Sequence, residues 1–221
     1  MPIYFFVPNL IGYFRVLLAF VAFAYAFDSP VIFIAAYTLS FVLDAADGLA
    51  ARAFNQCTQF GTILDMFTDR AATAGMLVVV SHNVVGTAGG DGLPFIQNDF
   101  SKKVAVLVAA GLVFLDVASH FVRMYVSSIQ SKGHKDTSAS IFSLLALYYT
   151  NRKVMGAFCV GQEVAYILCY ALCFYSNEYL WYAMYVCAPL CFLKQVVNVQ
   201  QLLDAMYHVA VLDADARKRK A

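Results

Sequence analysis

The polar residues best suited to chemistry lie in one 26-residue stretch between two long apolar runs. Asp44 and Asp47 are three residues apart and Asp65 and Asp69 are four apart, so each pair shares one face of a helix. An antiparallel hairpin that turns midway between the pairs would bring the four carboxylates together. Because oxygen-only ligands select hard cations, the cluster predicts a site for Mg2+ or Mn2+. Arg52 is placed to hold a phosphate by bidentate hydrogen bonds.

The elements that position these residues are predicted to be membrane-spanning helices. Hydrophobic residues make up 62% of the 221 and charged residues 13%, and the mean hydropathy is +0.68, which is too apolar for a soluble domain of this size. Six runs are long enough to cross about 30 Å of hydrocarbon. They cover residues 10–27, 31–50, 62–85, 104–126, 154–175 and 179–203. The predicted fold class is therefore all-α, a polytopic membrane protein with six transmembrane helices in one bundle.

The distribution of basic residues predicts the orientation of the spans. With a cytosolic N-terminus, six spans return the C-terminus to the cytosol, and the far side holds only Lys102 and Lys103 between spans. The cytosolic segments then contain Arg52, Arg123, Lys132, Lys135, Arg152, Lys153, Arg217, Lys218, Arg219 and Lys220. This asymmetry predicts that the aspartate cluster faces the cytosol. Ahead of the first span, Tyr4 and Phe5 suit a short interfacial segment at the N-terminus.

Three ionisable residues inside predicted spans have two interpretations each. Arg15 either extends its side chain to the cytosolic interface or contacts a lipid or substrate phosphate. Asp116 and His120 have helical i,i+4 spacing and either bind an acceptor substrate or form a pair that locks two helices together. Residues 127–153 read as a long polar loop, in which Tyr148 and Tyr149 suit an interfacial aromatic belt.

The central stretch also resembles a known family. The signature D-x2-D-G-x2-A-R-x8-G-x3-D-x3-D of the CDP-alcohol phosphotransferases is matched by Asp44, Asp47, Gly48, Ala51, Arg52, Gly61, Asp65 and Asp69. The resemblance implies one domain over residues 1–221, with its signature at 44–69, that forms homodimers. It also implies transfer of a phosphoryl-bearing group from a CDP-linked substrate to a hydroxyl, with release of CMP. All four aspartates would then hold one or two Mg2+ or Mn2+ ions, and Asp69 would act as the general base.

Further stretches resemble the eukaryotic phosphatidylinositol synthase branch of that family. They include F-V-P-N-L-I-G-Y at the start, L-D-V-A-S-H in the fourth span and Y-Y-T-N-R before the fifth. The branch implies CDP-diacylglycerol and myo-inositol as substrates, phosphatidylinositol as product, and the endoplasmic reticulum membrane as location. The predicted CDP-lipid contacts are Gly48, Arg52, Thr58 and Gly61, and the predicted acceptor contacts are Asp116 and His120. The expected partners are the substrates and the bilayer, with no nucleic acid.

Two other interpretations of the cluster stay open at this point. Within the enzyme class, the acceptor could be glycerol phosphate, serine or phosphatidylglycerol instead of inositol. Outside it, a divalent-cation carrier could use the carboxylates to bind its ion, although a carrier gains nothing from Arg52 beside the metal. The i,i+4 cysteine pairs in the last spans are better explained by packing between helices than by a soft-metal site.

Overall fold

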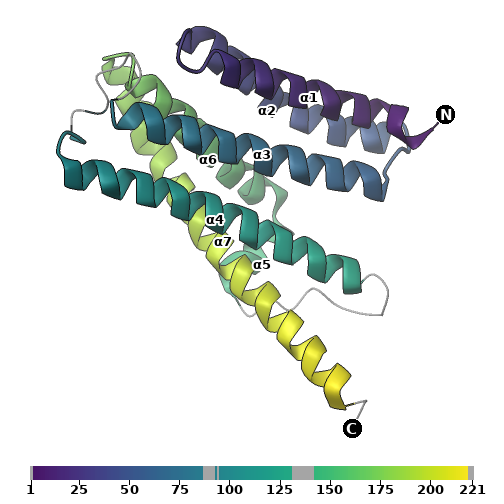
Figure 1. Cartoon of the computed structure of the whole chain (residues 1–221). Helices are drawn as coiled ribbons and strands as arrows, with labels where there is room; N and C mark the ends of the chain where they lie inside the picture. The colour runs from purple at the N-terminus through teal and green to yellow at the C-terminus, as the bar shows by residue number, and fades with distance from the viewer. Residues whose placement is uncertain (1, 87–92, 94, 131–141, 219–221) are drawn as a thin grey trace. The chain divides into compact units, whose positions relative to one another are not determined.

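The computed structural model describes residues 2–86, 93, 95–130 and 142–218. The described residues form helices and short connections, without a strand among them, which confirms the predicted all-α class. The elements, drawn in Figure 1, are the 3-10 helix η1 (Ile3–Phe5) and the α-helices α1 (Val7–Ala24), α2 (Pro30–Ala53), α3 (Gln59–Val84), α4 (Asp99–Gln130), α5 (Ser143–Thr150), α6 (Arg152–Leu172) and α7 (Glu178–Lys218).

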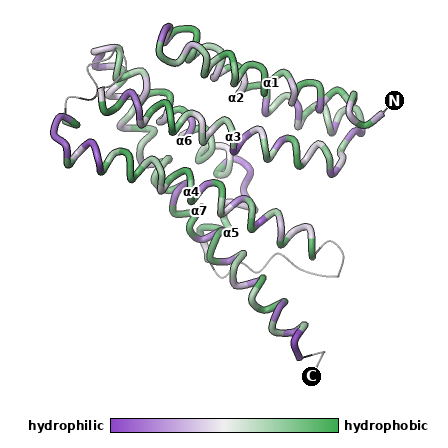
Figure 2. Tube along the Cα trace, viewed as in Figure 1, coloured by the Kyte–Doolittle hydropathy of each residue, from purple (hydrophilic) through white to green (hydrophobic). Residues whose placement is uncertain are grey.

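Five of the described helices are long and apolar enough to cross a membrane, namely α1, α2, α4, α6 and α7. The helix α3 overlaps the third predicted span, yet it is not among the five. Asp65, Asp69 and Arg70 in its first half and His82 near its end lower its hydropathy. A polytopic membrane protein is therefore confirmed, while the predicted number of six spans is not. Figure 2 shows the largely hydrophobic course of α1 and the hydrophilic C-terminal end of α7.

Local sequence explains where the first helices begin and turn. Pro30 stands in the first turn of α2, where its missing N–H leaves no hydrogen bond unmade. The connection from α2 to α3 turns through Asn55, which has a positive φ of 53°, a conformation that asparagine tolerates. Thr58 caps α3, because its Oγ1 accepts a hydrogen bond of 3.0 Å from the N–H of Gly61.

The described chain divides into two compact units. The first comprises Met1–Ala110 and Tyr166–Leu180, and the second comprises Gly111–Ala165 and Trp181–Ala221. In the first unit α1 packs against both α2 and α3 (Figure 1). Its core includes Phe33, whose ring centroid lies 4.2 Å from that of Tyr170, and the Tyr170 hydroxyl donates a 2.7 Å hydrogen bond to the carbonyl of Ala26. The single domain over residues 1–221 stays a prediction.

The second unit contains a helix that the sequence did not predict. Part of the expected loop over residues 127–153 belongs to α4, and another part forms α5. Tyr148 on α5 is 5% exposed and packs in a core with Leu145, Phe158 and Val197, so its assignment to an interfacial belt is wrong. The helix α5 is only 8 residues long, which is too short to cross a membrane, so the search for spans did not predict it. Lys132 and Lys135 of the predicted cytosolic side lie outside the described residues.

Candidate metal and nucleotide site

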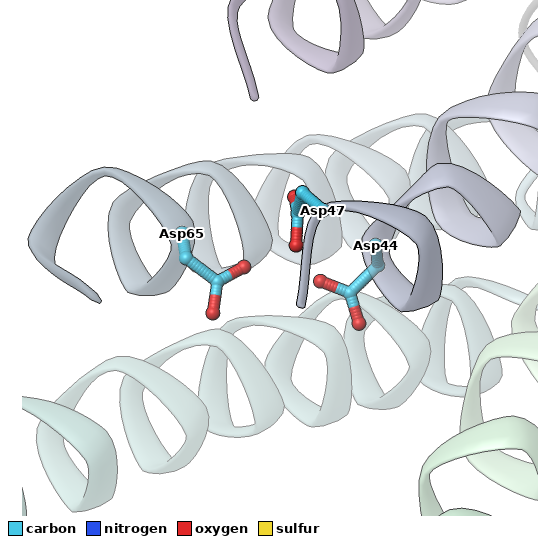
Figure 3. A group of neighbouring side chains, drawn as sticks. All are labelled: Asp44, Asp47 and Asp65. Atoms are coloured by element: carbon cyan, nitrogen blue, oxygen red, sulfur yellow. The ribbon is translucent and has the colours of Figure 1, made fainter. Parts of the chain in front are cut away.

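The hairpin of α2 and α3 brings the predicted aspartates together as their spacing required. Oxygens of Asp44, Asp47 and Asp65 all lie within 4.8 Å of one another, and Figure 3 shows the three carboxylates pointing into one space. Asp47 is buried, whereas the side chains of Asp44 and Asp65 are 38% and 47% exposed. The cluster is therefore covered on one side and accessible on the other.

Arg15 on α1 completes this cluster. Its Nη1 lies 2.6 Å from Asp47 and 2.9 Å from Asp65, and its Nη2 lies 2.9 Å from Asp44 and also contacts Asp69. The arginine side chain is only 3% exposed. Neither sequence interpretation of Arg15 describes this geometry, since the guanidinium faces four carboxylates of its own chain. The available signal was the cost of a charge inside a membrane span, which demands a partner of opposite charge.

The donor set fits a hard divalent cation. The cluster offers carboxylate oxygens alone, which Mg2+ and Mn2+ prefer, and three of its residues are close enough together to share one ion. The same carboxylates, together with Asp69, already converge on a positive group in the form of the Arg15 guanidinium. The fold thus brings together several negative charges that require a positive group between them.

A cavity of about 150 Å³ opens beside the cluster. Its lining contains all of the residues predicted to contact the CDP-lipid, which are Gly48, Arg52, Thr58 and Gly61. Asp47 and Asp65 of the cluster line it as well, and α1 adds Pro8, Asn9 and Gly12. The hairpin and α1 therefore place the phosphate-binding candidates and two of the metal-binding candidates around one space.

Arg52 differs from Arg15 in having no counter-ion among the residues that the structure describes. It is exposed at the end of α2, and among the described residues its side chain makes no ion pair or hydrogen bond. Within the described ranges, no ion pair joins Arg52 to the aspartates of the cluster. A free guanidinium on the wall of a cavity is available to an anion that enters.

The glycines of the cavity have unequal space around them. A Cβ on Gly61 would lie 3.0 Å from Asn9 Oδ1 and 3.3 Å from Thr58 Oγ1, so a side chain there would crowd both α1 and the cap of α3. A Cβ on Gly48 would meet only the Arg52 guanidinium, at 3.5 Å or more. Asn9 is fully buried and holds η1 through a 2.6 Å hydrogen bond from its Nδ2 to the carbonyl of Ile3.

Asp116 and His120 lie on α4 in the second unit. Asp116 is 3% exposed, and the Nδ1 of His120 lies 2.8 Å from the Asp116 carbonyl oxygen and 3.7 Å from Oδ1. The structure thus pairs the two side chains along one helix face, as their spacing predicted. Their role toward an acceptor stays a prediction.

A buried polar row on α7 was missed by the sequence analysis. Lys194, Asn198, Gln201 and Asp204 are each at most 2% exposed and recur at intervals of three or four residues, which is one face of a helix. Asp204 Oδ2 lies 3.3 Å from Arg123 Nη1 on α4. Gln201 accepts a 2.7 Å hydrogen bond from the hydroxyl of a tyrosine on α5, Tyr149. The helical period of these polar residues was the signal that could have revealed them.

Comparison with known proteins agrees with the site. A family model described as CDP-alcohol phosphatidyltransferase matches residues 5–193. The chain is 36% identical to the human CDP-diacylglycerol–inositol 3-phosphatidyltransferase, over 99% of this chain and 97% of that protein. It is 36% identical to the Candida albicans protein of the same name (99% and 87%) and 34% identical to a probable form 2 from Arabidopsis thaliana (100% and 96%). The search of solved structures found no significant match.

Proposed function

We propose that this chain, which belongs to the CDP-alcohol phosphatidyltransferase family, transfers the phosphatidyl group from CDP-diacylglycerol to myo-inositol and releases CMP. The observation that carries the proposal is the cavity that Asp47 and Asp65 share with Gly48, Arg52 and Gly61. It joins carboxylates that fit a metal to an arginine that is free to bind phosphate. The relatives named as inositol phosphatidyltransferases, similar over almost their whole length, support the choice of substrates.

In this proposal Asp44, Asp47, Asp65 and Asp69 hold one or two Mg2+ or Mn2+ ions. When bound there, the metal would supply positive charge that offsets the diphosphate and stabilises the CMP leaving group. Asp47 is the buried member of the set, while Asp44 and Asp65 present their oxygens on the accessible side. The carboxylates of two helices thereby fix where the diphosphate must lie.

Arg52 binds the diphosphate from the wall of the cavity. Its planar guanidinium offers two parallel donors to phosphate oxygens. Gly48 and Gly61 leave the cavity free of side chains where the phosphate and ribose approach the backbone, and Thr58 keeps the first turn of α3 in place by capping it. These contacts orient the phosphatidyl phosphorus toward the incoming acceptor.

Asp69 takes the proton of the attacking hydroxyl. An inositol oxygen forms a bond to the phosphatidyl phosphorus, the bond from that phosphorus to the oxygen of CMP breaks, and the hydroxyl proton passes to the Asp69 carboxylate. The side chain of Asp69 is 29% exposed, so the carboxylate is reachable and yet partly shielded from water.

The location of the enzyme follows the same reasoning. Its resemblance to the phosphatidylinositol synthases supports a location in the endoplasmic reticulum membrane and a homodimer. The cluster faces the cytosol in this proposal, because basic residues concentrate at the predicted cytosolic ends of the helices. A soluble acceptor then enters from the cytosol while the acyl chains of the lipid stay in the bilayer.

Incorporation of labelled acceptors in detergent micelles tests the proposal. The purified protein receives CDP-diacylglycerol with Mg2+ or Mn2+, and labelled myo-inositol, serine and glycerol 3-phosphate are compared in parallel. We expect incorporation of inositol alone, and loss of that incorporation with a chelator. Incorporation of a different acceptor would support the role of the aspartates in the transfer and would contradict inositol as the acceptor. No incorporation of any acceptor into lipid by folded protein would reject the transferase.

A further inference from the structure

Arg15 lies at the point where the carboxylates of α2 and α3 meet, and the proposed reaction gives it no task. We propose that Arg15 is an internal counter-ion that competes with the divalent cation for the aspartates and so sets the metal affinity of the site. This inference rests on the proposed function, which assigns the metal to the same carboxylates. It adds a residue from α1 that regulates how strongly the metal is held.

The two terminal nitrogens of Arg15 divide the aspartates between them. Nη1 contacts Asp47 on α2 and Asp65 on α3, and Nη2 contacts Asp44 on α2 and Asp69 on α3. Each nitrogen therefore bridges the two helices of the hairpin. Carboxylate oxygens that face these nitrogens offer the same lone pairs that a metal needs, and the fixed positive charge repels a second cation.

The surroundings of Arg15 show that its place is built into the fold. The Ser40 hydroxyl on α2 donates a 3.0 Å hydrogen bond to the carbonyl of Arg15. One turn earlier on α1, a Cβ on Gly12 would lie 3.1 Å from the Leu64 side chain, so α1 lies tightly against α3 at this level. Arg15 thus approaches from the covered side, while the exposed carboxylates leave the other side open to an ion from the cavity.

The charge balance predicts two opposite effects of removing Arg15. One guanidinium offsets only part of the charge of four carboxylates, so the cluster stays anionic and still attracts a divalent cation. Without Arg15 the attraction for the metal rises. The metal-free protein becomes less stable at the same time, because the crowded carboxylates, of which Asp47 is buried, lose their counter-charge.

A Mn2+ titration without any substrate tests this inference. The signal of free Mn2+ in electron paramagnetic resonance reports binding to the full-length protein in detergent. We expect Arg15→Gln to lower the Kd for Mn2+ by about tenfold and to lower the Tm measured in chelator. The matched control is Arg123→Gln, which removes a guanidinium that pairs with Asp204 in the second unit, and its Kd for Mn2+ should stay unchanged.

A second variant keeps the test decisive if Arg15→Gln does not fold. Arg15→Lys retains the charge, but a single ammonium group cannot bridge the two helices as the guanidinium does, so a smaller decrease in Kd is expected. An unchanged or higher Kd in the folded variants, with normal binding by the unaltered protein, overturns the inference and leaves the proposed function intact. Absence of Mn2+ binding in the unaltered protein overturns both.

Discussion

Asp69 lies one turn beyond Asp65 on α3, where its carboxylate contacts Arg15 and lies 3.5 Å from Arg70. If it accepts the proton of the acceptor, Asp69→Asn keeps the size of the side chain and loses the base. We expect kcat to fall by about 100-fold or more, with a smaller change in KM for CDP-diacylglycerol. Steady-state incorporation of labelled inositol measures both constants.

The control for this variant is Asp213→Asn, which removes a carboxylate from the exposed end of α7. It should leave kcat unchanged. Both proteins should elute as the unaltered protein does in size-exclusion chromatography. A kcat near normal in a folded Asp69→Asn variant would exclude Asp69 as the base.

Arg52 lines the cavity, and its guanidinium has no counter-ion within the described part of the chain. We expect Arg52→Ala to raise KM for CDP-diacylglycerol by about tenfold, since a charge-assisted contact to phosphate is lost, while KM for inositol stays constant. The KM of Arg52→Lys for CDP-diacylglycerol should lie between those of the unaltered protein and Arg52→Ala, because lysine keeps the charge but lacks the two parallel donors of the guanidinium. Arg217→Ala, an exposed arginine near the end of α7, serves as the control. An unchanged KM and kcat in Arg52→Ala would remove the role assigned to Arg52.

At the scale of elements, the start of α3 depends on Gly61. A Cβ there would crowd Asn9 Oδ1 and Thr58 Oγ1, so Gly61→Ala should disturb both the contact with α1 and the cap. We expect a loss of about 1 kcal/mol in the free energy of unfolding, together with reduced turnover. Gly111→Ala on α4 is the matched control, because its Cβ would meet nothing within 4 Å and alanine favours a helix. Equal Tm values for the two variants would contradict this account of Gly61.

The contact between α4 and α7 depends on the ion pair of Arg123 with Asp204. Asp204 is 2% exposed, so its replacement by alanine leaves Arg123 without its carboxylate in a largely buried place. We expect Asp204→Ala to cost about 3 kcal/mol of unfolding free energy, and the double variant Arg123→Ala/Asp204→Ala to cost less than the two single variants together. Thermal unfolding of the four proteins measures the coupling. Strict additivity would show that the pair contributes nothing.

For the whole molecule, removal of metal should separate folding from activity. We expect a chelator to abolish inositol incorporation and the helical circular dichroism signal to persist, because Arg15 keeps the aspartates partly compensated. Renewed Mn2+ should restore activity and raise the Tm, since a ligand that binds only the folded state stabilises it. Activity that survives complete chelation would reject the metal site, and unfolding on chelation would contradict the role of Arg15.

The hairpin and its aspartates were predictable because their spacing is local. Asp44 and Asp47, like Asp65 and Asp69, share a helix face by sequence alone, and the apolar runs around them fix the helices. The contact of Arg15 with these pairs was not predictable in the same way. It depends on the register of α1 against the hairpin, which helical periodicity does not specify. The polar row on α7 and the short helix α5 were not predicted for a related reason. Hydropathy divides the sequence only into spans and loops, so it reveals neither polar residues inside a span nor a short helix inside a loop.

The position of Arg15 ahead of the aspartates has a consequence for biogenesis. The ribosome makes the chain from its N-terminus, so α1 is inserted before α2 and α3 are complete. Each of the four aspartates then enters the bilayer after its cationic partner is already there. We expect the acidic hairpin to insert poorly when α1 lacks this charge. No earlier segment would then supply a positive charge to offset the free-energy cost of placing carboxylates in a membrane. The order of these residues along the chain thereby favours insertion of the aspartates into the membrane.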